Sequence, residues 1–139
     1  MLQLFSSQKW TKAYLPLIKR TDYYQIYLQT NASFKDDVRV RNIEFIGCSK
    51  FENNMDCNFN DDNCQWNMSS LNGQWQRNQG LLLDSIFGPL ADRKDEFGYY
   101  LYFKPDHDSL TSYASLTSNV IYGYCFTFWY FMNGHSIGS

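Results

Sequence analysis

The sequence predicts an all-β protein, a jelly-roll-like antiparallel β-sandwich. Apolar and polar residues alternate along most of the chain, as in strands with one covered face. Aromatic residues, which favour strands, make up 19% of the chain. Turn residues separate the alternating segments, and no segment longer than a turn or two shows the 3.6-residue period of a helix. Many short strands joined by turns indicate two packed sheets.

Two strand segments are expected in the first third of the chain. Alternation begins at Leu15 and Leu17 and continues in residues 24–28, which predicts a strand with one covered face. Residues 38–46 alternate more strictly, apolar against charged, so we expect a half-exposed strand there. Residues 49–56 are polar, rich in asparagine and without a period, which predicts a linker.

The second part of the chain begins with two cysteines, Cys57 and Cys64, with six residues between them. In a context of aromatic and turn residues, this spacing favours a loop closed by a disulfide. Short strands are then expected at residues 73–77, 98–103, 113–118 and 124–132. The last of these is a nearly continuous apolar run, typical of a buried strand, and it carries Cys125.

Length and charge limit the classes of protein to consider. The 139 residues suit one ordinary domain, and a net charge of −2 with interspersed signs indicates no nucleic-acid or anionic-membrane surface. No run approaches the roughly 18 to 20 apolar residues that span a bilayer, so this segment is not expected to insert into a membrane. The N-terminus lacks the basic region and cleavage site of a signal peptide. We therefore expect a fragment of a longer protein.

Two tripeptides match the acceptor pattern for N-glycosylation, Asn31-Ala32-Ser33 and Asn67-Met68-Ser69. They predict glycans on Asn31 and Asn67 if the chain passes through the secretory pathway. The four cysteines are even in number, which is typical of an extracellular framework and allows three pairings. The sequence therefore predicts an extracellular location.

A series of short motifs runs from Cys57 towards the end of the chain. It consists of Cys57, Phe59, Cys64 and Trp66; Trp75-Gln76-Arg77; Gly88, Pro89 and Asp92; Gly98-Tyr99-Tyr100-Leu101; Ala114, Leu116 and Ser118; and Cys125, Phe128-Trp129-Tyr130, Met132 and Gly134. This series resembles the MAM domain, the adhesion module shared by meprins, neuropilins and receptor tyrosine phosphatases. The resemblance implies an extracellular interaction module that has no catalytic activity.

Residues 1–48 resemble, more loosely, the C-terminal portion of a MAM domain. The similar features are Trp10, the pair Leu15 and Leu17, the segment 24–27 and the terminal Gly47-Cys48. The resemblance divides the chain into the end of one repeat (1–48), a linker (49–56) and the truncated start of a second repeat (57–139). Two arrangements stay open: the first block fills the vacant half of the sandwich, as a circular permutation, or the second domain remains incomplete.

The resemblance also implies a pairing of the cysteines. In MAM domains the first two cysteines pair, which implies a local Cys57–Cys64 bridge. The third pairs with the fourth at the end of the domain, so a circular permutation would join Cys48 to Cys125. A linker of about eight residues reaches up to roughly 25 Å, which permits this closure. The alternative is two unpaired thiols.

Departures from the family pattern argue against a metal. Some MAM domains bind a cation near acidic groups, but the acidic residue after the first Phe is Asn60 here, and the paired aspartates before the last strand are replaced by Arg41-Asn42. A hard cation prefers several charged oxygens. We therefore expect neither a metal nor a cofactor.

Three catalytic or metal-binding interpretations are weaker than structural ones. Residues 134–138 match the Gly-x-Ser-x-Gly nucleophile elbow, but that motif needs a following helix and later Asp and His residues, and one residue remains. A zinc site would need Cys57, Cys64, His107 and His135, whose cysteines are too widely spaced for a zinc knuckle. Asp92, Asp95 and Glu96 suit a solvated loop better than acid–base catalysis.

Aromatic residues could mark a binding surface. Residues 97–103 faintly resemble an RNA-binding strand but lack basic surroundings. Trp66, Trp75 and Trp129 could anchor a protein partner, yet we expect all three in the core.

The sequence thus favours a binding function. Partner choice is expected in loops 86–97 and 105–112, with protein partners that include identical or neighbouring MAM repeats. The alternatives are a non-catalytic accessory domain of a secreted metalloprotease, a glycan-binding jelly roll and a structural spacer.

Overall fold

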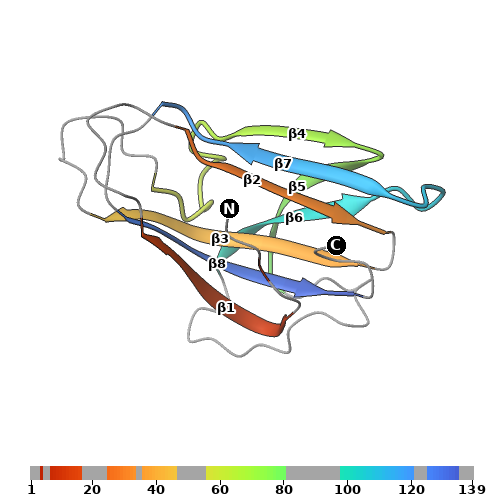
Figure 1. The fold of residues 1–139 in the computed structure, drawn as a ribbon, viewed down its shortest axis with the longest axis horizontal. Helices are drawn as coiled ribbons and strands as arrows, with labels where there is room; N and C mark the ends of the chain where they lie inside the picture. The colour runs from red at the N-terminus through yellow and green to blue at the C-terminus, as the bar shows by residue number, and fades with distance from the viewer. Residues whose placement is uncertain are drawn as a thin grey trace.

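The computed structural model describes residue 4 and residues 7–16, 25–33, 36–46, 56–80, 98–120 and 125–134. Within these ranges the chain forms eight strands and no helix (Figure 1). The strands are β1 (Ser7–Pro16), β2 (Tyr27–Ala32), β3 (Asp37–Ile46), β4 (Asn67–Leu71), β5 (Gly73–Gln79), β6 (Tyr99–Pro105), β7 (Ser112–Thr117) and β8 (Cys125–Asn133).

The strands form two antiparallel sheets. One sheet has five strands in the order β1-β8-β3-β6-β5, and the other has three in the order β2-β7-β4. Figure 1 shows β4, β7 and β2 together on one side and β3, β8 and β1 on the other. This arrangement confirms the predicted all-β sandwich.

Each sheet combines strands from both ends of the sequence. In the five-stranded sheet, β8 lies between β1 and β3, and its Phe126 pairs with Leu15 of β1 and Phe45 of β3. In the three-stranded sheet, β2 pairs along its whole length with β7, from Tyr27 opposite Thr117 to Ala32 opposite Ser112. The strands β1 to β3 and β4 to β8 therefore form one sandwich together.

Most strands lie where the alternation predicts them. β3, β5, β6, β7 and β8 match the predicted segments to within two residues at each end, whereas β2 begins at Tyr27 and runs beyond the predicted segment 24–28. Most of β1 precedes Leu15, where the first predicted alternation begins. β4 was not predicted, because all five of its residues are exposed and its sequence has no apolar alternation. Residues 49–55 of the predicted linker lie outside the described residues.

The core lies between the two sheets and is rich in aromatic rings. On β8, alternate residues Phe126, Phe128 and Tyr130 point into it. The Phe126 ring packs 5.0 Å from Phe45 and 6.2 Å from Trp66, measured between ring centroids. Strands from both parts of the chain thus contribute to one continuous hydrophobic core, which stabilises the pairing of the sheets.

The prediction of a half-exposed strand at residues 38–46 is wrong. Two of the three charged residues in this segment are buried, since Arg39 is 1% exposed and Arg41 is 5% exposed, whereas Glu44 is exposed. The Arg39 guanidinium lies 5.1 Å from the ring centroid of Tyr100 and 5.3 Å from that of Phe131. The outer face of the five-stranded sheet is therefore buried around Arg39 and Arg41, although Tyr14 and Glu44 on the same face are exposed. Alternation with charged residues does not report exposure when such residues pack on aromatic rings.

Candidate functional site

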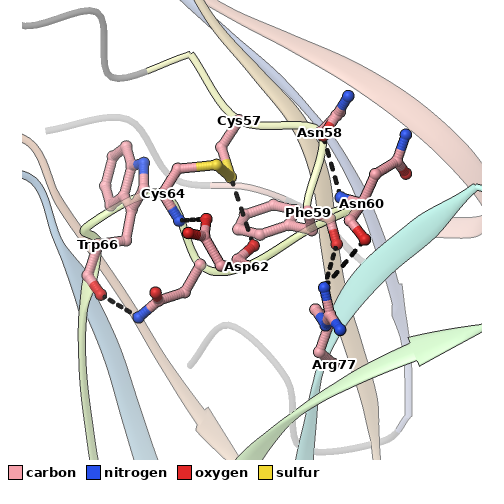
Figure 2. The surroundings of a disulfide bond; sticks show 9 residues. Cys57, Asn58, Phe59, Asn60, Asp62, Cys64, Trp66 and Arg77 are labelled. Carbon is pink, nitrogen blue, oxygen red and sulfur yellow. Dashed lines mark hydrogen bonds between the residues drawn. A yellow bond between two sulfur atoms is a disulfide. The ribbon is translucent and has the colours of Figure 1, made fainter.

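The cysteine loop at residues 57–64 is closed by a disulfide, as predicted. The Cys57 and Cys64 sulfurs are bonded at 2.04 Å, with their Cα atoms 5.7 Å apart (Figure 2). Cys57 also forms a two-bond β-bridge with Ile43, in which each backbone N–H donates to the other residue's carbonyl at 2.8 Å. The disulfide therefore lies at the contact between β3 and the loop.

Side chains within the loop hold an unusual backbone conformation. Phe59 and Cys64 have φ values of 61° and 50°, which residues other than glycine adopt at a cost. The Cys64 N–H donates to the Asp62 carboxylate at 2.7 Å, and the Asn60 N–H donates to the Asn58 side chain at 3.0 Å. These short-range bonds stabilise the turns, so that Phe59 is fully buried in the core.

Arg77 of β5 hydrogen-bonds to the backbone of the loop. Its Nη1 donates to the carbonyl oxygens of Phe59, at 3.4 Å, and Asn60, at 3.0 Å (Figure 2). Its guanidinium lies 4.7 Å from the ring centroid of Tyr99. The Asn60 side chain in turn accepts a hydrogen bond from the Tyr99 N–H at 3.4 Å. The loop is thus a rigid structural element that connects the strands β3, β5 and β6.

The described contacts give this loop a structural role. The sulfurs of Cys57 and Cys64 are oxidised, so they supply neither a nucleophile nor zinc ligands. His107 lies on an exposed loop beside Asp108, and the other residue considered for zinc, His135, lies outside the described residues. Within the described ranges, no group of three His, Cys, Asp or Glu side chains could hold a metal ion.

The residues that replace the family's acidic positions have structural contacts. Asn60 takes part in the hydrogen bond to β6 described above. The guanidinium of Arg41 lies 5.4 Å from the ring centroid of Trp10, and Asn42, at φ 46°, lies in an irregularity between β3 and β8. This irregularity accompanies the pairing of Ile43 with Cys57 in place of a residue of β8.

The three tryptophans that were expected in the core differ in their surroundings. Trp66 is 1% exposed within the core, and Trp75 packs against the core and donates from Nε1 to the Ser115 carbonyl at 3.2 Å. The core placement predicted for Trp129 is wrong. Trp129 is half-buried outside the core cluster, because its neighbours Phe128 and Tyr130 point inward and alternation turns it to the opposite face.

The loop between β6 and β7, residues 106–111, holds the most exposed large apolar side chain among the described residues. This side chain is Leu110, which is 94% exposed. Both ends of the loop are hydrogen-bonded to Asn72. The Asp106 N–H donates to the carbonyl oxygen of Asn72 at 2.9 Å, and the side-chain amide of Asn72 donates to the Thr111 carbonyl at 3.2 Å. We call residues 106–111 the Leu110 loop. It falls within the predicted loop 105–112.

Two acidic residues precede Leu110 in the loop. Asp106 and Asp108 are both exposed, and the carboxylate of Asp108 lies 3.2 Å from Nδ1 of His107. A fixed loop that presents an apolar group among polar ones can bind a protein surface without a large ordering cost. The other predicted partner loop, residues 86–97, lies outside the described residues, as do Asp92, Asp95 and Glu96 within it.

The structure describes some of the other predicted site residues, and others lie outside the described residues. Asn31 and Asn67, the predicted glycosylation sites, are both exposed on strands. Their glycosylation stays a prediction. Cys48, Ser136 and the side chain of Cys125 lie outside the described residues, so the pairing of Cys48 with Cys125 also stays a prediction.

Two further findings bear on the kind of protein. In the described part of the chain, no helix combines the length and apolar character needed to cross a membrane. A family model for the MAM domain, meprin/A5/mu, matches residues 57–139. No solved structure matches the chain.

Proposed function

Because this chain belongs to the MAM domain family, we propose that it is a non-catalytic protein-binding module within a larger secreted or membrane-anchored protein. MAM domains are extracellular adhesion and interaction modules, and a disulfide in this chain suits an oxidising compartment. The observation that carries the proposal is the family match together with the Cys57–Cys64 bridge. The described residues form two packed sheets and expose loop residues such as Leu110, as a binding scaffold would.

We propose the Leu110 loop as the partner-binding surface. Leu110 is almost fully exposed, yet both ends of its loop are hydrogen-bonded to Asn72. An exposed apolar side chain contributes little to the stability of the domain itself. Because the backbone of the loop is already fixed, less conformational entropy is lost when the loop binds a partner. Another protein, either an identical repeat or a neighbouring one, would bury this side chain.

Binding to immobilised protein tests this surface. The wild-type chain and the adjacent repeats of the full-length protein are immobilised. Binding of the oxidised wild-type chain to each of them is then compared with binding of Leu110→Ser. The matched control is Val120→Ser, because Val120 is also exposed, at 49%, but follows the opposite end of β7. We expect Leu110→Ser to weaken binding about tenfold, as burial of such an anchor contributes about 1–2 kcal/mol. Equal effects of the two substitutions would contradict the proposal.

We also propose that residues 1–48 complete the sandwich as a circular permutation of a MAM domain, separated by the linker 49–56 from residues 57–139. The pairing of β1 and β3 with β8 supports this arrangement. Ile46, two residues before Cys48 in the sequence, lies opposite Cys125 in the β3–β8 register. Peptide mapping under non-reducing conditions should recover Cys48 joined to Cys125. Alkylation of both as free thiols would refute the pairing.

A further inference from the structure

We propose that N-linked glycans on Asn31 and Asn67 cover the outer face of the three-stranded sheet and prevent its edge strands from pairing with other chains. The sequons alone indicate only that these asparagines can be modified. The tertiary structure adds that both lie on one face of one sheet, at its two opposite edges. This inference is independent of the partner-binding surface proposed above.

The register of the strands places the two asparagines. β7 is the central strand, so β2 and β4 are both edges. On β2, Tyr27, Gln29 and Asn31 are exposed, whereas Leu28 and Ala32 pack on the core, so Asn31 belongs to the outer face.

Asn67 of β4 lies on the same face. It pairs with Thr117 of β7, which in turn pairs with Tyr27. At the other end of the face, Asn31 pairs with Tyr113, which pairs with Leu71 of β4. The asparagines are thus diagonal corners of the face. They are separated by two strand spacings, about 10 Å, and by four residues along the strands, about 13 Å.

The other two corners of the outer face, Tyr27 on β2 and Leu71 on β4, expose apolar surface. Tyr27 is 52% exposed and Leu71 is 64% exposed. The hydroxyl groups of Tyr27 and Tyr113 are hydrogen-bonded to each other across the strands. Neutral, partly apolar strand faces of this kind favour association with other chains.

The three-stranded sheet also lacks the charges that protect the edges of the other sheet. None of the residues in β2, β4 and β7 is charged. By contrast, the edge strand β1 of the five-stranded sheet carries exposed Lys9 and Lys12, and its other edge strand, β5, carries exposed Arg77. Charged side chains, lysine above all, are the usual means of protecting an exposed edge. A bulky, hydrophilic glycan at each uncharged edge has the same effect.

Replacement of the asparagines by residues that differ in charge tests the proposal. The chain is produced in a eukaryotic secretion host, and mass spectrometry of its peptides shows whether Asn31 and Asn67 carry glycans. The double variant Asn31→Gln/Asn67→Gln removes both glycans without adding charge. Asn31→Lys/Asn67→Lys removes them and places a lysine at each edge. Asn119→Gln, at an exposed asparagine outside any sequon, is the control for the substitution itself.

Sedimentation velocity over a range of concentrations gives the result. We expect the glycosylated chain, the lysine double variant and Asn119→Gln to sediment alike, and the glutamine double variant to shift to larger species than these three form. Circular dichroism and the thermal midpoint show whether each variant is folded. If the glutamine variant does not fold, the folded glycoprotein is trimmed with an endoglycosidase that leaves one sugar on each asparagine, and the same shift is expected.

Three results would overturn the proposal. The first is a secreted chain without a glycan on either asparagine. The second is a glutamine double variant, or a trimmed chain, that stays as monomeric as the glycosylated one. The third is association of the lysine variant to the same extent as the glutamine variant, because protection would then not depend on blocking the edges.

Discussion

The guanidinium of Arg39 forms two hydrogen bonds with the carboxylate of Asp37, two residues earlier on β3, and both side chains are buried. Nε lies 2.7 Å from Oδ1 and Nη2 lies 2.5 Å from Oδ2. The rings of Tyr100 and Phe131 flank the same guanidinium. This ion pair therefore lies in the buried part of the outer face of the five-stranded sheet.

Removing one member of this pair should destabilise the protein strongly. Asp37→Ala leaves the Arg39 charge buried without its carboxylate, which costs about 3–5 kcal/mol of unfolding free energy. Lys12→Ala is the matched control, because Lys12 pairs with Glu44 at 3.4 Å with both side chains about half exposed, and such pairs contribute about 0–1 kcal/mol. Urea unfolding measures both. Similar losses for the two variants would show that burial does not strengthen the Asp37–Arg39 pair.

The Cys57–Cys64 bridge should contribute to stability although its ring is short. The loop-closure relation for its sequence separation of 7 gives about 2.5 kcal/mol, so Cys57→Ala/Cys64→Ala should lose about this much unfolding free energy. Hydrogen exchange should also become faster at the amides of Ile43 and Cys57, which bond to each other. Reducing the wild-type chain breaks the same bridge together with the proposed Cys48–Cys125 pair, so it should cost at least as much unfolding free energy. A variant as stable as the wild type would contradict this prediction.

Gly134, which follows β8, should tolerate no side chain. A Cβ there would overlap Oδ1 of Asp36, and that carboxylate is held in place by the backbone N–H and hydroxyl of Ser33 at 2.7 and 2.9 Å. Gly134→Ala should therefore cost about 3 kcal/mol, at the upper end of overpacking effects. Gly80→Ala is the control, since no described atom lies within 4 Å of a Cβ added there and φ strain alone costs about 1 kcal/mol.

A double-mutant cycle separates the clash at Gly134 from other causes. In an Asp36→Ala background most of the obstructing side chain is absent, so Gly134→Ala should cost less than it does in the wild type. Thermal or urea unfolding of the four proteins gives the coupling. An unchanged cost in both backgrounds would place the effect of Gly134 elsewhere.

Tyr100 should make stability depend on pH in the alkaline range. Burial raises the pKa of its phenol above the ordinary 10.0, nearby Arg39 lowers this pKa, and Asp37 raises it. Because the pKa is raised in the folded state, the contribution is fully present below the unfolded pKa and is lost as pH rises through the folded pKa. At neutral pH, Tyr100→Phe should cost about 1 kcal/mol, since the hydroxyl donates to the Gly80 carbonyl at 2.8 Å.

Unfolding measured from about pH 8 to about pH 11 checks this dependence. The difference in stability between the wild type and Tyr100→Phe should shrink towards the alkaline end. A difference that stays constant over the range would show that Tyr100 does not titrate with a raised pKa.

Features that depend on short-range order could be predicted from the amino-acid sequence. A period of two predicts strands wherever one face is covered, and β5, β6 and β7 lie where it placed them. The Cys57–Cys64 bridge was predictable because the two cysteines are close in the chain and lie among turn residues. The motifs from Cys57 to Gly134 likewise identified the family, since the match covers residues 57–139. The exposed strand β4 has no such local pattern and was missed.

Which distant segments meet is known from the three-dimensional fold alone. It places β8 between β1 and β3, buries Arg39 against Phe131, pairs Ile43 with Cys57, and brings Asn31 and Asn67 to one face. The physical reason is that periodicity shows that a strand has two different faces but not what covers each face. Pairing and cover depend on contacts between residues far apart in the chain, whose free energy comes from the packed sandwich as a whole.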